Sequence, residues 1–229
     1  MRSCLKALLG FFTAIPVKAD LDFSCAWALP YVAAPLVGGA SAAVMMATGS
    51  PALAYLALLL LTGLNHLDGL ADTADALMVR DRERARAVLE DPRRGTAGMF
   101  AVAAALLLSA SYLKTPLQLL EAEVFSKAVA VVFAAYSKPF KQGLGSAFVE
   151  SARRRWPLAL PALALVISAS PIPACAALAA SALAYRAAYK HLGGVNGDVL
   201  GYLLEASRVA FITSWGLGGW LHGPLVRLL

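Results

Sequence analysis

Three carboxylates with helical spacing are the clearest candidates for chemistry in this chain. Asp68, Asp72 and Asp75 are separated by four and then three residues, in a run that starts at His66. On a helix, this spacing stacks the three side chains along one face. Because like charges on one face repel one another, they need a compensating cation, and carboxylate oxygens suit Mg²⁺, which also binds substrate phosphates. The pattern predicts a metal site for a phosphorylated substrate, with His66 as a hydrogen-bonding partner or a base.

Arginines and lysines follow the acidic run in two polar segments. In Arg80–Arg84, charges of alternating sign indicate a solvated amphipathic helix that includes Arg82. The turn from Asp91 to Gly98 brings Arg93 and Arg94 to the start of an expected helix, and both guanidinium groups and helix N-termini favour phosphate. A later basic loop contains Lys138 and Lys141. It serves equally well as a phosphate contact or as an ordinary positively charged cytoplasmic loop.

A glycine-rich loop near residue 197 supplies the last candidates. Four glycines lie between residues 193 and 201, around Asn196 and Asp198. Such a loop lets backbone N–H groups approach a metal-bound phosphate closely. We therefore expect Asn196 and Gly197 to contact substrate and Asp198 to complete the metal site.

The composition is that of a membrane protein. Of the 229 residues, 59% are hydrophobic and only 15% are charged, against about 45–50% and about 25% in soluble domains. We predict a single all-α domain over residues 1–229, with residues 1–26 as a cytoplasmic or interfacial segment. Cys4, Cys25 and Cys175 form no CxxC pair, and we expect them to be buried, unpaired apolar residues.

Apolar segments predict about seven transmembrane helices in a polytopic integral membrane bundle. They lie near residues 27–48, 53–67, 97–113, 124–137, 156–170, 174–189 and 208–225. Placing the N-terminus in the cytoplasm gathers nearly all positive loops, including the segment up to Arg208, on that side. The sequence thus predicts a multi-pass protein of the cytoplasmic membrane whose active site faces the cytoplasm. Its partners are then the lipid bilayer and small substrates, without nucleic acid, and an oligomer is allowed but not predicted.

Four segments, taken in order, resemble one family of membrane enzymes. The run from His66 to Leu77 looks like the signature of the cobalamin synthase family, the adenosylcobinamide-GDP ribazoletransferases. The segment from Arg80 to Gly98, and Gly143-Leu144-Gly145 with Phe148, resemble the motifs that follow in that family. Gly193 to Gly201 is similar to its C-terminal glycine-aspartate loop. The resemblance covers residues 60–205 approximately.

The resemblance implies a reaction and a cofactor. Members join adenosylcobinamide-GDP to α-ribazole or its 5′-phosphate, release GMP and require Mg²⁺. In such a site, Asp68, Asp72 and Asp75 would hold Mg²⁺, with Asp198 completing the set. Asp75 or Asp72 could accept the proton of the ribazole hydroxyl. Arg82, Arg93, Arg94, Lys138 and Lys141 would contact the substrates.

Two other functions stay open at this point. A membrane phosphotransferase of the CDP-alcohol type also clusters aspartates after an apolar helix, but its Ala-Arg pair and its later Gly-xxx-Asp-xxx-Asp are missing here. An ion or proton transporter would place acids at mid-membrane. Only Glu121, Glu123 and Lys127 approach such a position, and we expect them at an interfacial helix start.

Overall fold

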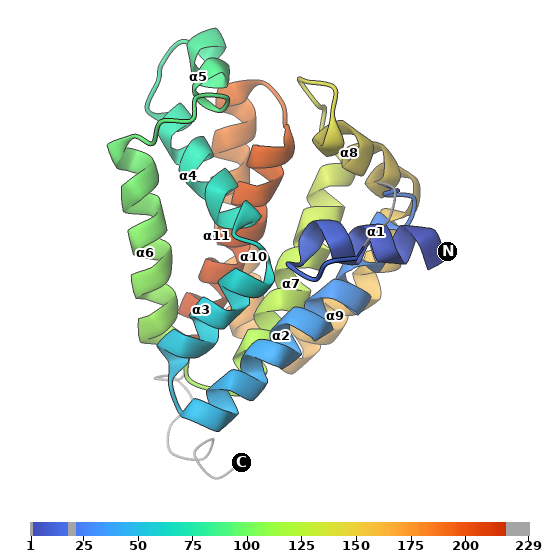
Figure 1. Ribbon diagram of the computed structural model, residues 1–229, viewed down its shortest axis with the longest axis vertical. Coiled ribbons are helices and arrows are strands. Elements are labelled where there is room, and N and C mark those ends of the chain that lie inside the picture. Colours follow the sequence, from blue (N-terminus) through green and yellow to red (C-terminus); the bar gives the residue numbers. More distant parts are fainter. Residues whose placement is uncertain (1, 18–21, 219–229) are drawn as a thin grey trace.

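The computed structural model describes residues 2–17 and 22–218, and these form helices joined by turns, without a strand (Figure 1). The predicted all-helical class is therefore confirmed. The α-helices are α1 (Arg2–Phe12), α2 (Leu29–Thr48), α3 (Pro51–Leu61), α4 (Asn65–Leu77), α5 (Arg82–Val88), α6 (Thr96–Tyr112), α7 (Pro116–Ala135), α8 (Leu144–Arg155), α9 (Leu160–Ala169), α10 (Pro171–Leu192) and α11 (Gly197–Gly218). Short 3₁₀ turns at Ala26–Ala28 and Trp156–Ala159 precede α2 and α9.

Local signals set several of these boundaries. The Ser50 hydroxyl accepts the N–H of Leu53, and the Thr115 hydroxyl accepts the N–H of Gln118, so each caps the helix that follows. Each cap is followed by a proline in the first turn, where the missing N–H costs nothing. Gly49 ends α2 in the left-handed conformation, at φ +66°.

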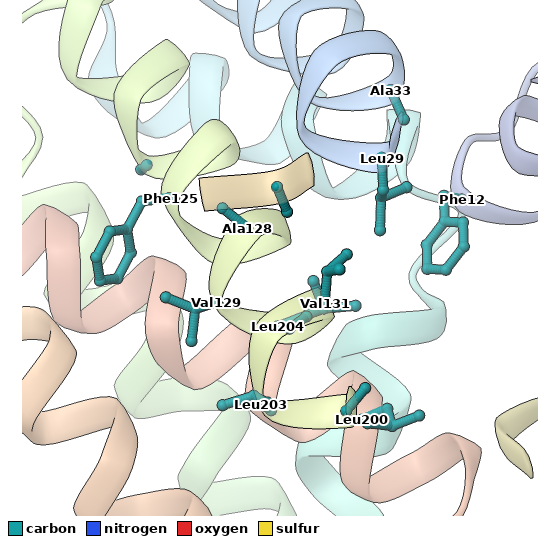
Figure 2. Close-up of a cluster of buried hydrophobic side chains, with 14 of the residues drawn as sticks. Phe12, Leu29, Ala33, Phe125, Ala128, Val129, Val131, Leu200, Leu203 and Leu204 are labelled. Atoms are coloured by element: carbon teal, nitrogen blue, oxygen red, sulfur yellow. The ribbon is translucent and has the colours of Figure 1, made fainter. Parts of the chain in front are cut away.

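The core lies where α2, α7 and α11 meet. Figure 2 shows Leu29 of α2, Val131 of α7 and Leu204 of α11 within one cluster of buried side chains, with Phe12 of α1 at its edge. Most of α7 is buried, because it packs against both of the other helices. In Figure 1, α1 lies across the outside of the bundle. It buries Leu8 and Phe12 beneath it.

The predicted span 53–67 is broken into two helices. α3 ends at Leu61, and α4 begins at Asn65 after a bend of 91°. Both Gly63 (φ +68°) and Leu64 (φ +63°) are left-handed at the bend. This conformation suits glycine and costs a leucine about 1–2 kcal/mol. The sequence predicted the span but not its bend, because an apolar run does not reveal a change of helix direction.

The other predicted spans are helical, but two of the helices start well before the predicted residue, and one of these is α7, which begins at Pro116 where 124 was predicted. The last one, 208–225, belongs to α11, which starts eleven residues earlier at Gly197; residues 219–225 lie outside the described part of the chain. Within the described ranges, Ala26–Thr48 is the one helix long and apolar enough to cross a membrane alone. α3 and α4 meet that test only as a bent pair.

A set of charged side chains is sealed between α7 and α11. Glu123, Lys127, Glu205 and Arg208 have no exposed surface. Arg208 is paired with both glutamates, and Lys127 is paired with Glu123. The Tyr55 hydroxyl donates to Glu205. The two positive and two negative groups balance, as buried charges must.

This network corrects two sequence predictions. Glu123 and Lys127 were expected at an interfacial helix start, and Arg208 was expected within a cytoplasmic loop. All three lie inside the bundle, because Arg208, eighty-five residues from Glu123, supplies the charge that makes burial tolerable.

The cysteines also differ from expectation. Cys4 and Cys25 are buried as predicted, but they are paired in a disulfide with their Cα atoms 6.0 Å apart. The bond ties α1 to the segment before α2. Cys175 is free and exposed, although burial was expected. Sequence spacing alone could not reveal the pair, because the two cysteines belong to elements brought together by packing.

Candidate active site

The helix α4 carries the predicted carboxylates, and the bend before it sets their direction. Asp68 and Asp72 are one turn apart on this helix, as their spacing predicted. The side chain of Asp68 is 57% exposed, whereas that of Asp72 is only 8% exposed. The face they share is covered by the turn that leads into α6.

Arg94 forms a fork across these two carboxylates. Its Nη1 donates to Asp72 and its Nη2 donates to Asp68. A planar guanidinium with two outward N–H groups fits two acceptors one helical turn apart. Arg94 thus supplies one positive charge against two negative charges.

Charge and burial both act on Asp72. The pKa of Asp72 is raised to about 6, mainly by burial; Arg94 opposes the rise, and the charges of Asp68 and Asp198 add to it. Burial likewise raises the pKa of Asp198, with the charge of Asp68 adding to the effect. The three acids therefore act on one another across α4 and α11, and a cation between them is favoured.

Asp75 has a different set of contacts from its neighbours. Its carboxylate accepts the backbone N–H of Gly95 at 2.7 Å and that of Gly98 at 2.8 Å. A Cβ at Gly95 or Gly98 would lie 2.4 Å or 2.5 Å from an Asp75 carboxylate oxygen. Asp75 therefore caps α6 and holds the Arg94 turn against α4, which is a positioning role.

The start of α11 brings Asp198 to the same site. The Asn196 side chain donates to Asp198 at 2.7 Å and accepts the N–H of Val199 at 3.0 Å, so it caps the helix. A Cβ at Gly69 of α4 would lie 2.6 Å from the carbonyl oxygen of Asp198. Gly69 thus permits the close approach of a neighbouring helix.

The chemistry of these donors can be tested against the expected Mg²⁺. Within residues 2–17 and 22–218, no group of three or more His, Cys, Asp or Glu side chains is arranged to hold a metal. The predicted four-aspartate set is therefore not assembled. Asp68 and Asp72 do converge on one cation, the Arg94 guanidinium, and Mg²⁺ commonly takes one or two carboxylates together with water and phosphate oxygens. These two residues fit that mode.

Most of the predicted basic contacts lie away from the carboxylates. Arg82 donates to the carbonyls of Lys190 and His191 at the end of α10. Arg93 is paired with Asp91 at 2.7 Å, and Lys141 with Glu90 at 2.5 Å. The Arg93 pair lies within one turn, whereas Arg82 reaches the end of α10 and Lys141 reaches the loop before α6. Of the predicted basic residues, Arg94 is the one paired with Asp68 and Asp72.

Lys138 contributes through its backbone. Its carbonyl accepts the N–H of Val195 at 2.9 Å, and the Phe140 N–H donates to the Val195 carbonyl at 3.1 Å. This bridge joins the α7–α8 loop to the α10–α11 loop. A Cβ at Gly194 would lie 2.6 Å from the Lys138 carbonyl, so the bridge requires a glycine there.

Two cavities meet at α4. The smaller has a volume of about 190 Å³ and contains His66, Asp198 and Gly197 in its wall. The larger, of about 630 Å³, is lined by Arg94 and apolar residues of α6. Asn65 and Asp68 line both cavities. The sequence analysis did not predict Asn65, although it directly precedes the acidic run. It also did not predict Phe12, which lines the smaller cavity and has no sequence signal.

Comparisons with known proteins identify the relatives of this chain. The family model for cobalamin-5-phosphate synthase matches residues 4–216. An adenosylcobinamide-GDP ribazoletransferase of Pyrobaculum calidifontis is 65% identical over 213 residues, or 93% of this chain and 98% of that protein. The protein of the same name from Thermococcus kodakarensis is 36% identical over 232 residues, or 94% and 99% of the two chains. No solved structure matches the chain.

The same comparisons decide between the alternatives left open by the sequence. They support neither a CDP-alcohol phosphotransferase nor a transporter. A Pyrobaculum aerophilum relative, also named adenosylcobinamide-GDP ribazoletransferase, is 60% identical over 91% of this chain and 94% of its own length. Because the family match and these relatives span nearly all of the described residues, the chain belongs to the cobalamin-5-phosphate synthase family.

Proposed function

We propose that this protein transfers the adenosylcobinamide-phosphate group of adenosylcobinamide-GDP to α-ribazole or its 5′-phosphate. A bond forms between a hydroxyl oxygen of the acceptor and the phosphorus on the cobinamide side of the diphosphate. The bond from that phosphorus to the bridging oxygen breaks, GMP leaves with that oxygen, and the acceptor hydroxyl releases one proton. The relatives carry the name of this reaction.

One observation carries the proposal: Arg94 is paired with Asp68 and Asp72 where two cavities meet, with Arg94 in the wall of the larger cavity and Asp68 in the walls of both. A reaction that joins two substrates at a diphosphate needs a cationic contact for phosphate and a place where both substrates meet. Arg94 can bind phosphate oxygens in the bidentate manner of a guanidinium. Its two carboxylate partners keep it in position in the absence of substrate.

The cofactor and the proton acceptor are part of the proposal. Asp68 and Asp72 would hold Mg²⁺, which when bound neutralises charge on the phosphoryl oxygens. Asp198, expected from the sequence as a further ligand, takes the role of proton acceptor, because it lines the smaller cavity and burial raises its pKa. Asp75 holds the Arg94 turn in place.

We also propose that the protein lies in the cytoplasmic membrane as a multi-pass bundle, with its active site facing the cytoplasm. Large apolar side chains are exposed along several helices, including Leu60 of α3, Leu107 of α6 and Leu183 of α10. Exposed apolar surface of this kind favours a lipid environment. Figure 1 shows α5, α8 and the α10–α11 connection at one end of the bundle, where the arginine-rich segments gather.

The decisive experiment is a transfer assay in detergent or liposomes. Purified protein receives adenosylcobinamide-GDP and α-ribazole, with Mg²⁺ or with EDTA, and GMP and the corrinoid product are followed. We expect both products in equal amounts with Mg²⁺ and none with EDTA. GMP without a corrinoid product would indicate hydrolysis, and no turnover from folded protein would contradict the proposed function.

A further inference from the structure

The two cavities differ in size and in the chemistry of their walls. The smaller lies among α1, α4, α7, α8 and α11, and the rings of Phe12, His66 and Phe148 line it. The ring centroid of Phe12 is 5.9 Å from that of His66 and 5.7 Å from that of Phe148. Leucines of α11 add apolar surface, and Asp68 and Asp198 supply carboxylates. A small aromatic chamber with acidic groups in its wall suits one flat ring that carries hydroxyl groups.

Volume restricts what the smaller cavity can hold. A cavity of about 150 Å³ accommodates a benzene ring, so about 190 Å³ has room for one aromatic base. A corrin ring or a guanosine diphosphate is too large for it. His66 also has a buried Nδ1 atom that makes no hydrogen bond to any described residue. A polar ring atom of a ligand is a natural partner for the imidazole that lines this chamber.

The larger cavity has the opposite properties. Its volume of about 630 Å³ is within the range of pockets that hold drug-sized ligands and cofactors. Met99, Val102 and Leu106 of α6 provide apolar surface, and Arg94 provides a cationic group. An apolar wall with one guanidinium matches a bulky group that carries phosphates.

We propose that α4 separates two substrate subsites, with the aromatic base of the acceptor in the smaller cavity and the phosphate-bearing end of the donor in the larger one. Asn65 and Asp68, one helical turn apart, line both cavities and form the ridge where the substrates meet. This assignment rests on the proposed transfer reaction. It gives α1 a function, because Phe12 supplies one wall of the acceptor subsite.

Filling each cavity separately tests the assignment. Ala130→Val on α7 adds two carbons to the wall of the smaller cavity, and Ala103→Phe on α6 adds a ring to the wall of the larger one. We expect Ala130→Val to raise the KM for α-ribazole about tenfold or more and to leave the KM for the donor unchanged. Ala103→Phe should do the reverse. Each variant is thus the control for the other.

Binding separates failure of this inference from failure of the proposed function. Equilibrium dialysis measures α-ribazole binding without turnover, with unfolding temperature as the check on folding. Weaker binding in Ala130→Val alone supports the acceptor subsite even in a protein that shows no turnover. If both variants affect both substrates equally, or neither affects any, the two-subsite assignment is overturned while transfer activity stands. If Ala130→Val does not fold, Leu200→Phe on α11 takes its place, because it also narrows the smaller cavity. Binding of α-ribazole to Leu200→Phe as tight as to the unmodified protein would contradict the acceptor subsite.

Discussion

Two groups of carboxylates in this protein each hold an arginine, and they differ in access. Asp68 and Asp72 share Arg94, which is 36% exposed and lines the larger cavity, and Asp68 lines both cavities. Glu123 and Glu205 share Arg208 with no exposed surface at all. The first group has an excess of negative charge that a metal cation can offset, whereas the second is already balanced by Lys127. Residue type alone therefore does not separate a reactive cluster from a structural one; charge balance and access do.

The largest effect should come from the open cluster. Asp72→Asn removes a charge that Arg94 and the expected Mg²⁺ both need, so we expect the rate of GMP release to fall about 10³-fold. The unfolding temperature without Mg²⁺ should not fall, because burial disfavours the ionised form of Asp72 and raises its pKa to about 6. The matched control is Glu83→Gln on α5, whose side chain is exposed. Full activity in Asp72→Asn would remove this cluster from the mechanism.

In the sealed cluster, a substitution should lower the stability of the fold. Glu123→Ala leaves Lys127 and one side of Arg208 buried without a partner, which typically costs about 3–5 kcal/mol of stability. Denaturant unfolding of the purified protein measures the loss, with the exposed Glu150→Ala as control. A stability unchanged by Glu123→Ala would mean that the network does not hold α7 to α11.

A smaller effect is expected where the open cluster is fixed in place. In Gly98→Ala, the new Cβ would lie 2.5 Å from Asp75 and 2.8 Å from the Ala71 carbonyl, so α6 must move away from α4. Such overpacking costs about 1–3 kcal/mol, and activity should fall because Arg94 moves too. Gly39→Ala on α2 is the control, since nothing lies within 4 Å of its Cβ. Equal stability and activity in both variants would contradict the positioning role of Asp75.

The smallest effect should come from a surface pair that belongs to neither cluster. Lys141 and Glu90 are 54% and 58% exposed, so their ion pair contributes less than about 1 kcal/mol. Lys141→Ala and Glu90→Ala should therefore change the unfolding temperature little and equally. If Lys141→Ala alone raises the KM for the donor, Lys141 contacts phosphate, as the sequence suggested.

Local pattern predicted part of the site. The spacing of Asp68 and Asp72 placed them on one helix face, and the structure has them one turn apart on α4. Pattern could not distinguish Arg94 from Arg93, because the choice depends on how one turn packs against α4. Arg93 is 88% exposed and is paired with its neighbour Asp91, whereas Arg94 reaches across to another helix.

Long-range packing accounts for what the sequence did not reveal. Lys127 interrupts an apolar run, and its burial is tolerated only because residues that become neighbours after folding balance its charge. Phe12 precedes every motif of the chain, yet it lines the same cavity as Asp198. A helix break at Gly63 looks, in sequence, like any glycine within an apolar segment.

The backbone bridge between Lys138 and Val195 has a consequence for how this protein can diverge. Every residue has a carbonyl, so position 138 can accept almost any side chain without loss of the bridge. Positions 140 and 195 must keep their N–H groups, so proline is excluded there, and position 194 must stay glycine. The side chains of these two loops can therefore vary among related proteins, whereas the distance between the loops is fixed by the backbone bridge.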